Sequence, residues 1–68
     1  MTRKQELEMY KRFAKEQLKK CLGISVPMTR IILLETGIKK DKVTDVLFED
    51  NKTHKQYRTF LGYAEIID

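Results

Sequence analysis

The first third of the chain carries the pattern of one amphipathic helix, and this pattern restricts the fold more than any other feature. Thr2 followed by Gln5 fits a capping box, and Gly23 stands where a left-handed residue ends a helix. At 100° per residue, six apolar side chains fall within an arc of about 120°, the width of a core-facing stripe. They are Leu7, Tyr10, Ala14, Leu18, Cys21 and Leu22. We therefore predict a helix over residues 2–22 that packs on the rest of the chain.

Two apolar residues of this helix, Met9 and Phe13, lie off the main stripe. A second group of apolar residues stands near the C-terminus, at Tyr63, Ile66 and Ile67. In a chain this short most apolar residues are needed for the core. These five are therefore the candidates for an interface with a second copy of the chain or with another protein.

Glycine and proline are rare after the first helix, so few positions mark the ends of further elements. Ser25, two residues before the only proline, is typical of a helix start, and the apolar run after it predicts a short buried helix that ends near Gly37. Residues 39–48 carry apolar side chains at helical spacing, and another capping box begins at Thr53. These patterns predict an all-α protein: one compact domain, residues 1–68, of three to four helices.

An alternative fold remains open for the second half of the chain. Residues 43–49 and 53–61 are rich in β-branched and aromatic side chains, and the Asp50-Asn51-Lys52 cluster has acceptable turn chemistry. Periodicity does not separate a helix from a strand in runs this short. The alternative is therefore an α+β domain in which helices precede a C-terminal β-hairpin.

Residues 29–48 resemble the helix-turn-helix of bacterial and phage repressors. Gly37 takes the place of the glycine in the tight turn, with Ile32 and Leu33 before it and Ile38 directly after it. Two further apolar residues follow six and nine places after the glycine, at Val43 and Val46. Two short helices cross at about 90–120° when the turn relaxes φ and the facing positions are apolar. The resemblance implies a central helix-turn-helix in a small transcriptional regulator, of the kind found in phages and mobile elements.

The resemblance also implies that residues 39–48 form the recognition helix, which lies in the major groove of double-stranded DNA. Lysines near its start would contact phosphates or guanine, and its threonine and aspartates would contact base edges. Basic residues outside this helix would hold the DNA backbone. The implied DNA-binding residues are Arg30, Lys39, Lys40, Asp41, Lys42, Thr44, Asp45, Lys52, Lys55 and Arg58.

The positive charge of the chain is distributed unevenly. Residues 2–22 hold seven basic and three acidic side chains, whereas residues 23–50 hold four basic and five acidic ones. Because the net charge of +4 arises on the first helix, a second function is open: a non-catalytic interaction module, such as a small inhibitor or adaptor. It would dock through the basic first helix or through an apolar C-terminal patch.

Length and composition exclude several other classes of protein. With 68 residues the chain has no room for a deep cleft beside its core, so we expect no enzyme activity, no small-molecule substrate and no cofactor. One cysteine cannot form an internal disulfide, and with His54 it does not complete a zinc site, so we expect no metal. A small domain without such cross-links is typical of the cytoplasm. No apolar run reaches about 18 residues, so we expect no association with a membrane.

Overall fold

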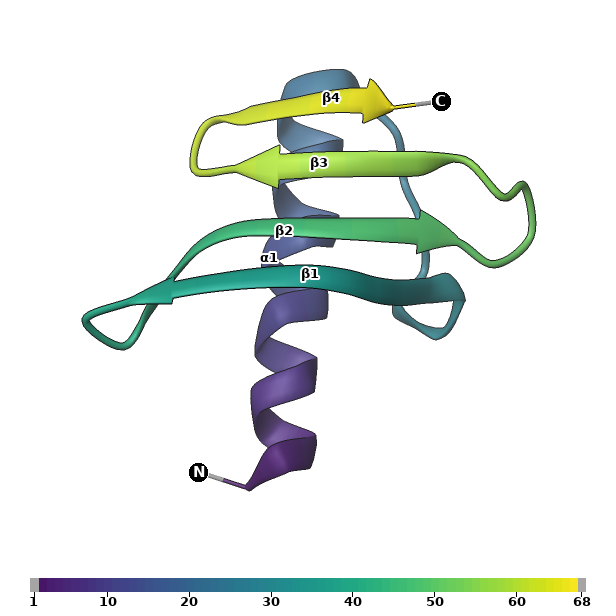
Figure 1. Ribbon diagram of the computed structural model, residues 1–68. Coiled ribbons are helices and arrows are strands. Elements are labelled where there is room, and N and C mark those ends of the chain that lie inside the picture. Colours follow the sequence, from purple (N-terminus) through teal and green to yellow (C-terminus); the bar gives the residue numbers. More distant parts are fainter. Residues whose placement is uncertain (1, 68) are drawn as a thin grey trace.

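The computed structural model, which describes residues 2–67, consists of one helix packed on a four-stranded sheet (Figure 1). The strands are antiparallel and follow the order of the chain, β1-β2-β3-β4. A short 3-10 helix connects α1 to the sheet. The elements are α1 (Arg3–Leu22), η1 (Met28–Arg30), β1 (Ile31–Lys39), β2 (Lys42–Asp50), β3 (Gln56–Phe60) and β4 (Tyr63–Ile67).

Both ends of α1 confirm the prediction from the sequence. The Thr2 hydroxyl accepts a hydrogen bond from the Gln5 backbone N–H (3.2 Å), and the Gln5 side chain accepts one from the Thr2 backbone N–H (3.0 Å). Gly23 ends the helix with a φ of 69°, in the left-handed region that favours glycine. The helix crosses the strands at a steep angle and covers one face of the sheet, while the other face is open (Figure 1).

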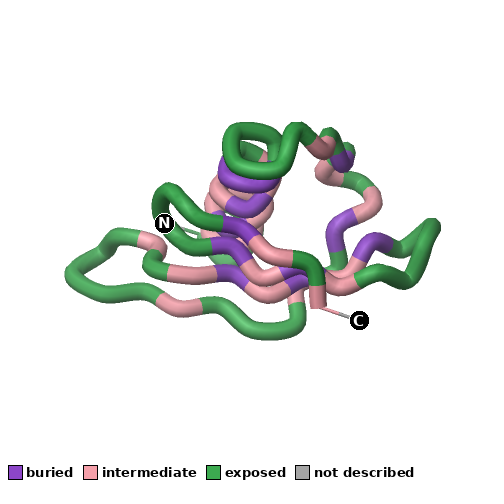
Figure 2. The backbone as a smooth tube through the Cα atoms, turned by 90° about the horizontal axis from the view of Figure 1, so that it is seen from above, coloured by how far each residue is buried: buried purple, intermediate pink, exposed green. Residues whose placement is uncertain are grey.

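The core lies between α1 and the covered face of the sheet, where the buried positions gather (Figure 2). A polar contact fixes one end of this layer, because the buried Gln17 side chain accepts a hydrogen bond (2.9 Å) from the backbone N–H of Gly62 in the β3–β4 turn. The core residues are Tyr10, Ala14, Leu18, Val26, Ile31, Val46, Phe48, Tyr57 and Ala64.

The predicted all-α fold is wrong. Residues 31–50, which were expected to hold a short helix and a recognition helix, form the β1–β2 hairpin. Residues 56–67, the expected last helix, form β3 and β4. The α+β alternative has the right class, since its hairpin strands correspond to β2 and β3. It placed helices before that hairpin, however, where the structure has β1.

Two β-bulges explain why the apolar residues of β1 and β2 follow one another at helical spacing in the sequence. In β1, Leu33 pairs with Phe48 and Glu35 with Leu47, so Leu34 is an extra residue. In β2 the extra residue is Thr44, because the pairs are Gly37 with Asp45 and Ile38 with Val43. Each extra residue reverses the alternation of side chains between the two faces. Apolar residues three apart, such as Val43 and Val46, therefore face the core together from a strand.

Gly37 does not lie in a turn, as the helix-turn-helix required, but inside β1 opposite Asp45. Its role is steric. A Cβ atom at this position would overlap with the Asp45 carboxylate and would lie 2.6 Å from the Thr44 hydroxyl. The glycine therefore lets the side chains at the β2 bulge cross over the backbone of β1.

Candidate functional site

The β1–β2 turn holds three of the predicted DNA-binding lysines. Lys39 and Lys42 pair at the end of the hairpin, and Lys40 and Asp41 form the two-residue turn between them. All four side chains are exposed. The structure therefore brings these residues together, but at the tip of a hairpin rather than on a recognition helix.

Arg30, predicted to contact DNA, is instead an ion-pair partner of Asp50. Its Nε donates to Asp50 Oδ1 (3.0 Å), and its second nitrogen, NH2, donates to Oδ2. The Asp50 carboxylate also accepts a hydrogen bond from the backbone N–H of Lys52 (2.9 Å). The guanidinium is the main cause, and the Lys52 N–H a further one, of the low pKa of Asp50, which falls from 3.8 to about 2. Arg30 is thus a structural residue that fixes the β2–β3 loop.

Arg58 and Asp45 were also predicted to contact DNA, but they lie on the open face of the sheet. An Arg58 nitrogen lies 3.4 Å from the Glu35 carboxylate and another lies 3.9 Å from that of Asp45. Lys52 and Lys55 lie in the β2–β3 loop, at the opposite end of the sheet from the β1–β2 turn (Figure 1). The predicted DNA-binding residues therefore do not form one surface.

The open face of the sheet is defined by its outward-pointing strand positions other than Lys39 and Lys42. These two lysines point to the same side but stand at the β1–β2 turn and are counted with it. The remaining open face is acidic and partly apolar. Four carboxylates surround one guanidinium on it, which gives a net charge of −3. Five apolar side chains lie among them, and the Phe60 and Tyr63 rings are 6.0 Å apart. This open face consists of Ile32, Glu35, Gly37, Asp45, Leu47, Glu49, Gln56, Arg58, Phe60, Tyr63, Glu65 and Ile67.

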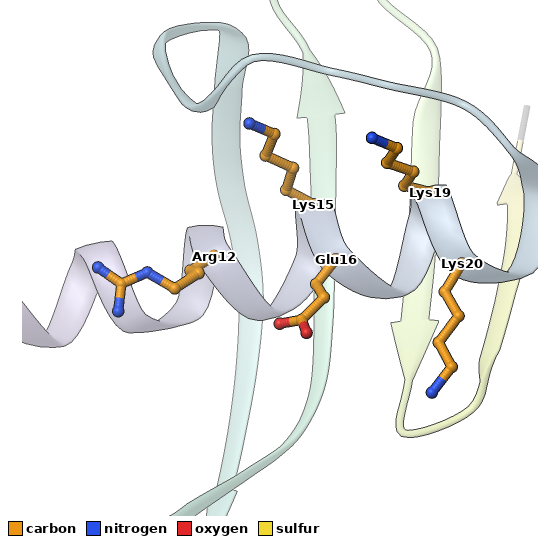
Figure 3. Close-up of a pocket in the computed structure, with 5 residues that line it drawn as sticks. All are labelled: Arg12, Lys15, Glu16, Lys19 and Lys20. Carbon is orange, nitrogen blue, oxygen red and sulfur yellow. The ribbon is translucent and has the colours of Figure 1, made fainter.

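The outer face of α1 and the β1–β2 turn form a basic surface. Nine basic side chains stand against three carboxylates here, which gives a net charge of +6. Within residues 2–67 none of the lysines forms an ion pair. Figure 3 shows Lys15 and Lys19 extending to one side of α1, with Glu16 and Lys20 on the other. The basic surface consists of Lys4, Glu8, Lys11, Arg12, Lys15, Glu16, Lys19, Lys20, Lys39, Lys40, Asp41 and Lys42.

A shallow groove joins the two parts of the basic surface. Met9 and Phe13 of α1 line it together with Val43 and with Leu61 of the β3–β4 turn, which is 80% exposed. Arg12 and Lys42 flank these apolar residues from the two elements. The side chains of α1 and of the β1–β2 turn are therefore neighbours on one continuous surface.

The candidate interface residues of the sequence analysis have different surroundings. Met9 and Phe13 are half-buried and pack against the core from one flank of α1. Tyr63 and Ile67 belong to the open face, and the Tyr63 hydroxyl donates to Glu65 (3.2 Å), which raises the pKa of Tyr63. Ile66 points to the covered side of β4 and is 50% exposed.

Cys21 was expected in the core, but its side chain is exposed near the end of α1. Among residues 2–67 no three His, Cys, Asp or Glu side chains are placed to hold a metal ion. Within the same part of the chain, α1 is too polar to cross a bilayer. Comparisons with protein families, with curated proteins and with solved structures gave no match to this chain.

The separation of positive and negative charge between two surfaces was predicted only in part from the sequence. Counting charges by segment located the excess on α1. The count did not show that the turn lysines join α1, or that four carboxylates gather on the opposite layer. Both depend on the register of the sheet.

Proposed function

We propose that this protein binds duplex DNA, without catalysis, through the phosphate backbone, and that the basic surface forms the contact. One observation carries the proposal: the outer face of α1 and the β1–β2 turn together have a charge of +6, while the open face away from this turn has −3. A regulatory role through occupancy of DNA fits this activity.

The chemistry of the basic surface supports a phosphate partner. Its lysines are free of intramolecular ion pairs within residues 2–67, so binding does not require the loss of an internal contact. Lys11, Lys15 and Lys19 follow one another at four-residue intervals along α1, about 6 Å apart along the helix axis. Lysines in such a row neutralise phosphates and release counterions, which is the main source of affinity in sequence-independent binding.

A fluorescence anisotropy titration of labelled duplex DNA at about 50 and 200 mM salt tests the proposal. We expect binding that weakens steeply with salt, as for a protein that contacts about four phosphates. The double variant Lys11→Glu/Lys15→Glu should weaken binding on the order of 100-fold at low salt. The matched control, Lys52→Glu/Lys55→Glu, removes the same charge at the β2–β3 loop and should have a small effect.

Two results would contradict the proposal. No binding of the wild-type protein at about 50 mM salt, where sequence-independent association is measurable, would exclude it. An equal loss of affinity in both double variants would show that net charge, rather than the basic surface, determines binding.

A second candidate function, a protein-interaction module, is favoured by the open face. Phe60 and Tyr63 are 36% and 52% exposed there, next to Leu47 and Ile67. An uncovered sheet face with apolar side chains among carboxylates suits a partner with a basic, partly apolar surface. A photo-crosslinking residue at Tyr63 tests this candidate. A discrete adduct with one cellular protein, absent when the crosslinker replaces Lys52, would favour it over DNA binding.

A further inference from the structure

The helix α1 is longer than the sheet is wide. Its 20 residues span about 30 Å, whereas four strands about 4.8 Å apart span about 14 Å. The N-terminal half of α1 therefore continues past β1, the edge strand (Figure 1). Leu7 lies on the same stripe as the buried Tyr10, Ala14 and Leu18, but it is only half-buried. The core-facing stripe of α1 extends over a region where residues 2–67 supply no strand.

The outer edge of β1 is suited to pair with a further strand. Within residues 2–67 it has no strand beside it, and β1 is rich in apolar residues. Leu34 and Ile38 are 44% and 49% exposed. Soluble proteins commonly protect such edges with prolines, inward-pointing charges or bulges. Here the bulge at Leu34 interrupts the edge once, and Glu35–Lys39 remains regular on the β1 side.

We propose that β1 pairs antiparallel with β1 of a second copy of this chain. Pairing centred on Gly37 would place Glu35 of each copy opposite Lys39 of the other, on the uncovered side of the sheet. Ile38 would lie opposite Thr36 on the covered face. The edge is therefore complementary to itself in charge at Glu35 and Lys39.

This arrangement also accounts for the exposed flank of α1. Two antiparallel edge strands in one continuous sheet are related by an axis perpendicular to the sheet, so both helices lie on the same face. Met9 and Ile38 line one shallow pocket with Glu6 and Asp41, on the side of α1 that would face this axis. Met9 would therefore approach the second helix, and Leu7 would cover a strand of the second copy.

Sedimentation velocity of the full chain without nucleic acid, from micromolar to millimolar protein, tests the dimer. A paired segment of five residues gives a small interface, so we expect reversible dimerisation in the micromolar range. Ile38→Lys should weaken dimerisation at least tenfold, because it places a charge in the paired edge. Ile66→Lys is the matched control, since Ile66 is 50% exposed on the other edge strand. It should leave dimerisation unchanged.

A charge-swap experiment identifies the register. Glu35→Lys or Lys39→Glu alone sets like charges opposite each other, and the double variant restores opposite charges. We expect each single variant to weaken the dimer and the double variant to recover it. A protein that is monomeric at all concentrations would overturn the proposal, as would a dimer that Ile66→Lys disrupts and Ile38→Lys does not. Neither outcome bears on DNA binding, which the anisotropy titration measures separately.

Discussion

The carboxylate of Asp50 is buried, with 3% of its side chain exposed, and connects two segments that are distant in the sequence. It binds the Arg30 guanidinium, at the entry to β1, and the backbone of Lys52, in the β2–β3 loop. The Asn51 backbone N–H donates to the Arg30 carbonyl (2.8 Å), so the same two segments are also joined through the main chain. Arg30, which the DNA-binding prediction placed at an interface, is therefore part of the contact that joins these two segments.

The low pKa of Asp50 makes stability depend on pH. Its pKa is about 2 in the folded protein and near the ordinary value of 3.8 in the unfolded chain. The stabilisation is therefore complete above about pH 5 and is lost as the pH falls through 4 towards 2, a loss on the order of 2 kcal/mol. Urea denaturation between pH 2 and 7 measures this loss. In Asp50→Asn the corresponding part of the pH dependence should be absent.

The same variant has a predicted cost at neutral pH. Asp50→Asn leaves the Arg30 guanidinium without its carboxylate, and breaking a buried ion pair typically costs 3–5 kcal/mol. Because the Arg30 side chain is 31% exposed and keeps access to water, we expect about 3 kcal/mol. Glu65→Gln, at a half-buried carboxylate of the open face, is the control and should cost less than about 1 kcal/mol. Equal losses in the two variants would contradict a special role for Asp50.

At the scale of elements, the β1–β2 turn has a sequence that suits its backbone poorly. Lys40 and Asp41 have φ values of 51° and 61°, as in a type I′ turn, for which asparagine and glycine are preferred. A left-handed conformation costs a non-glycine residue about 1–2 kcal/mol. Asp41→Gly should therefore raise the free energy of unfolding by about 0.5–1 kcal/mol, because glycine also loses more entropy on folding.

Thermal denaturation followed by circular dichroism measures the effect of the turn. Lys52→Gly is the control, because Lys52 lies in the β2–β3 loop and is not among the residues with positive φ. Its replacement adds the entropic cost of glycine without relieving strain, so the melting temperature should fall. A decrease for Asp41→Gly as well would show that the left-handed turn carries no strain.

The elements differ in how far they could be predicted from the sequence. The apolar periodicity of α1 holds from Leu7 to Leu18 and both ends of the helix carry local capping contacts, so local information was sufficient to predict the helix. The strands are stabilised by pairing between distant segments, and the bulges at Leu34 and Thr44 give their apolar residues helical spacing. The buried polar strand residues Asp50 and Thr59 further obscure the alternation. The charge of α1 could be counted from the sequence. That the lysines of the β1–β2 turn lie next to α1 could be seen only from the fold.

At the scale of the whole molecule, the two layers carry opposite charge. The shortest dimension of the Cα trace is 17 Å, about twice the screening length of about 8 Å at physiological ionic strength. A phosphate at the outer face of α1 is therefore largely shielded from the carboxylates of the open face. DNA affinity should follow the charge of the basic surface rather than the net charge of the chain.

Two double variants of equal charge separate these possibilities. Glu8→Gln/Glu16→Gln and Glu49→Gln/Glu65→Gln both raise the net charge from +4 by two, the first pair on the outer face of α1 and the second on the open face. We expect the first to tighten DNA binding about fivefold to tenfold at 0.15 M salt and the second to change it less than about twofold. Anisotropy titrations at a common salt concentration measure both affinities. Equal tightening in the two variants would mean that the field of the whole molecule, and not the surface formed by α1 and the β1–β2 turn, attracts the DNA.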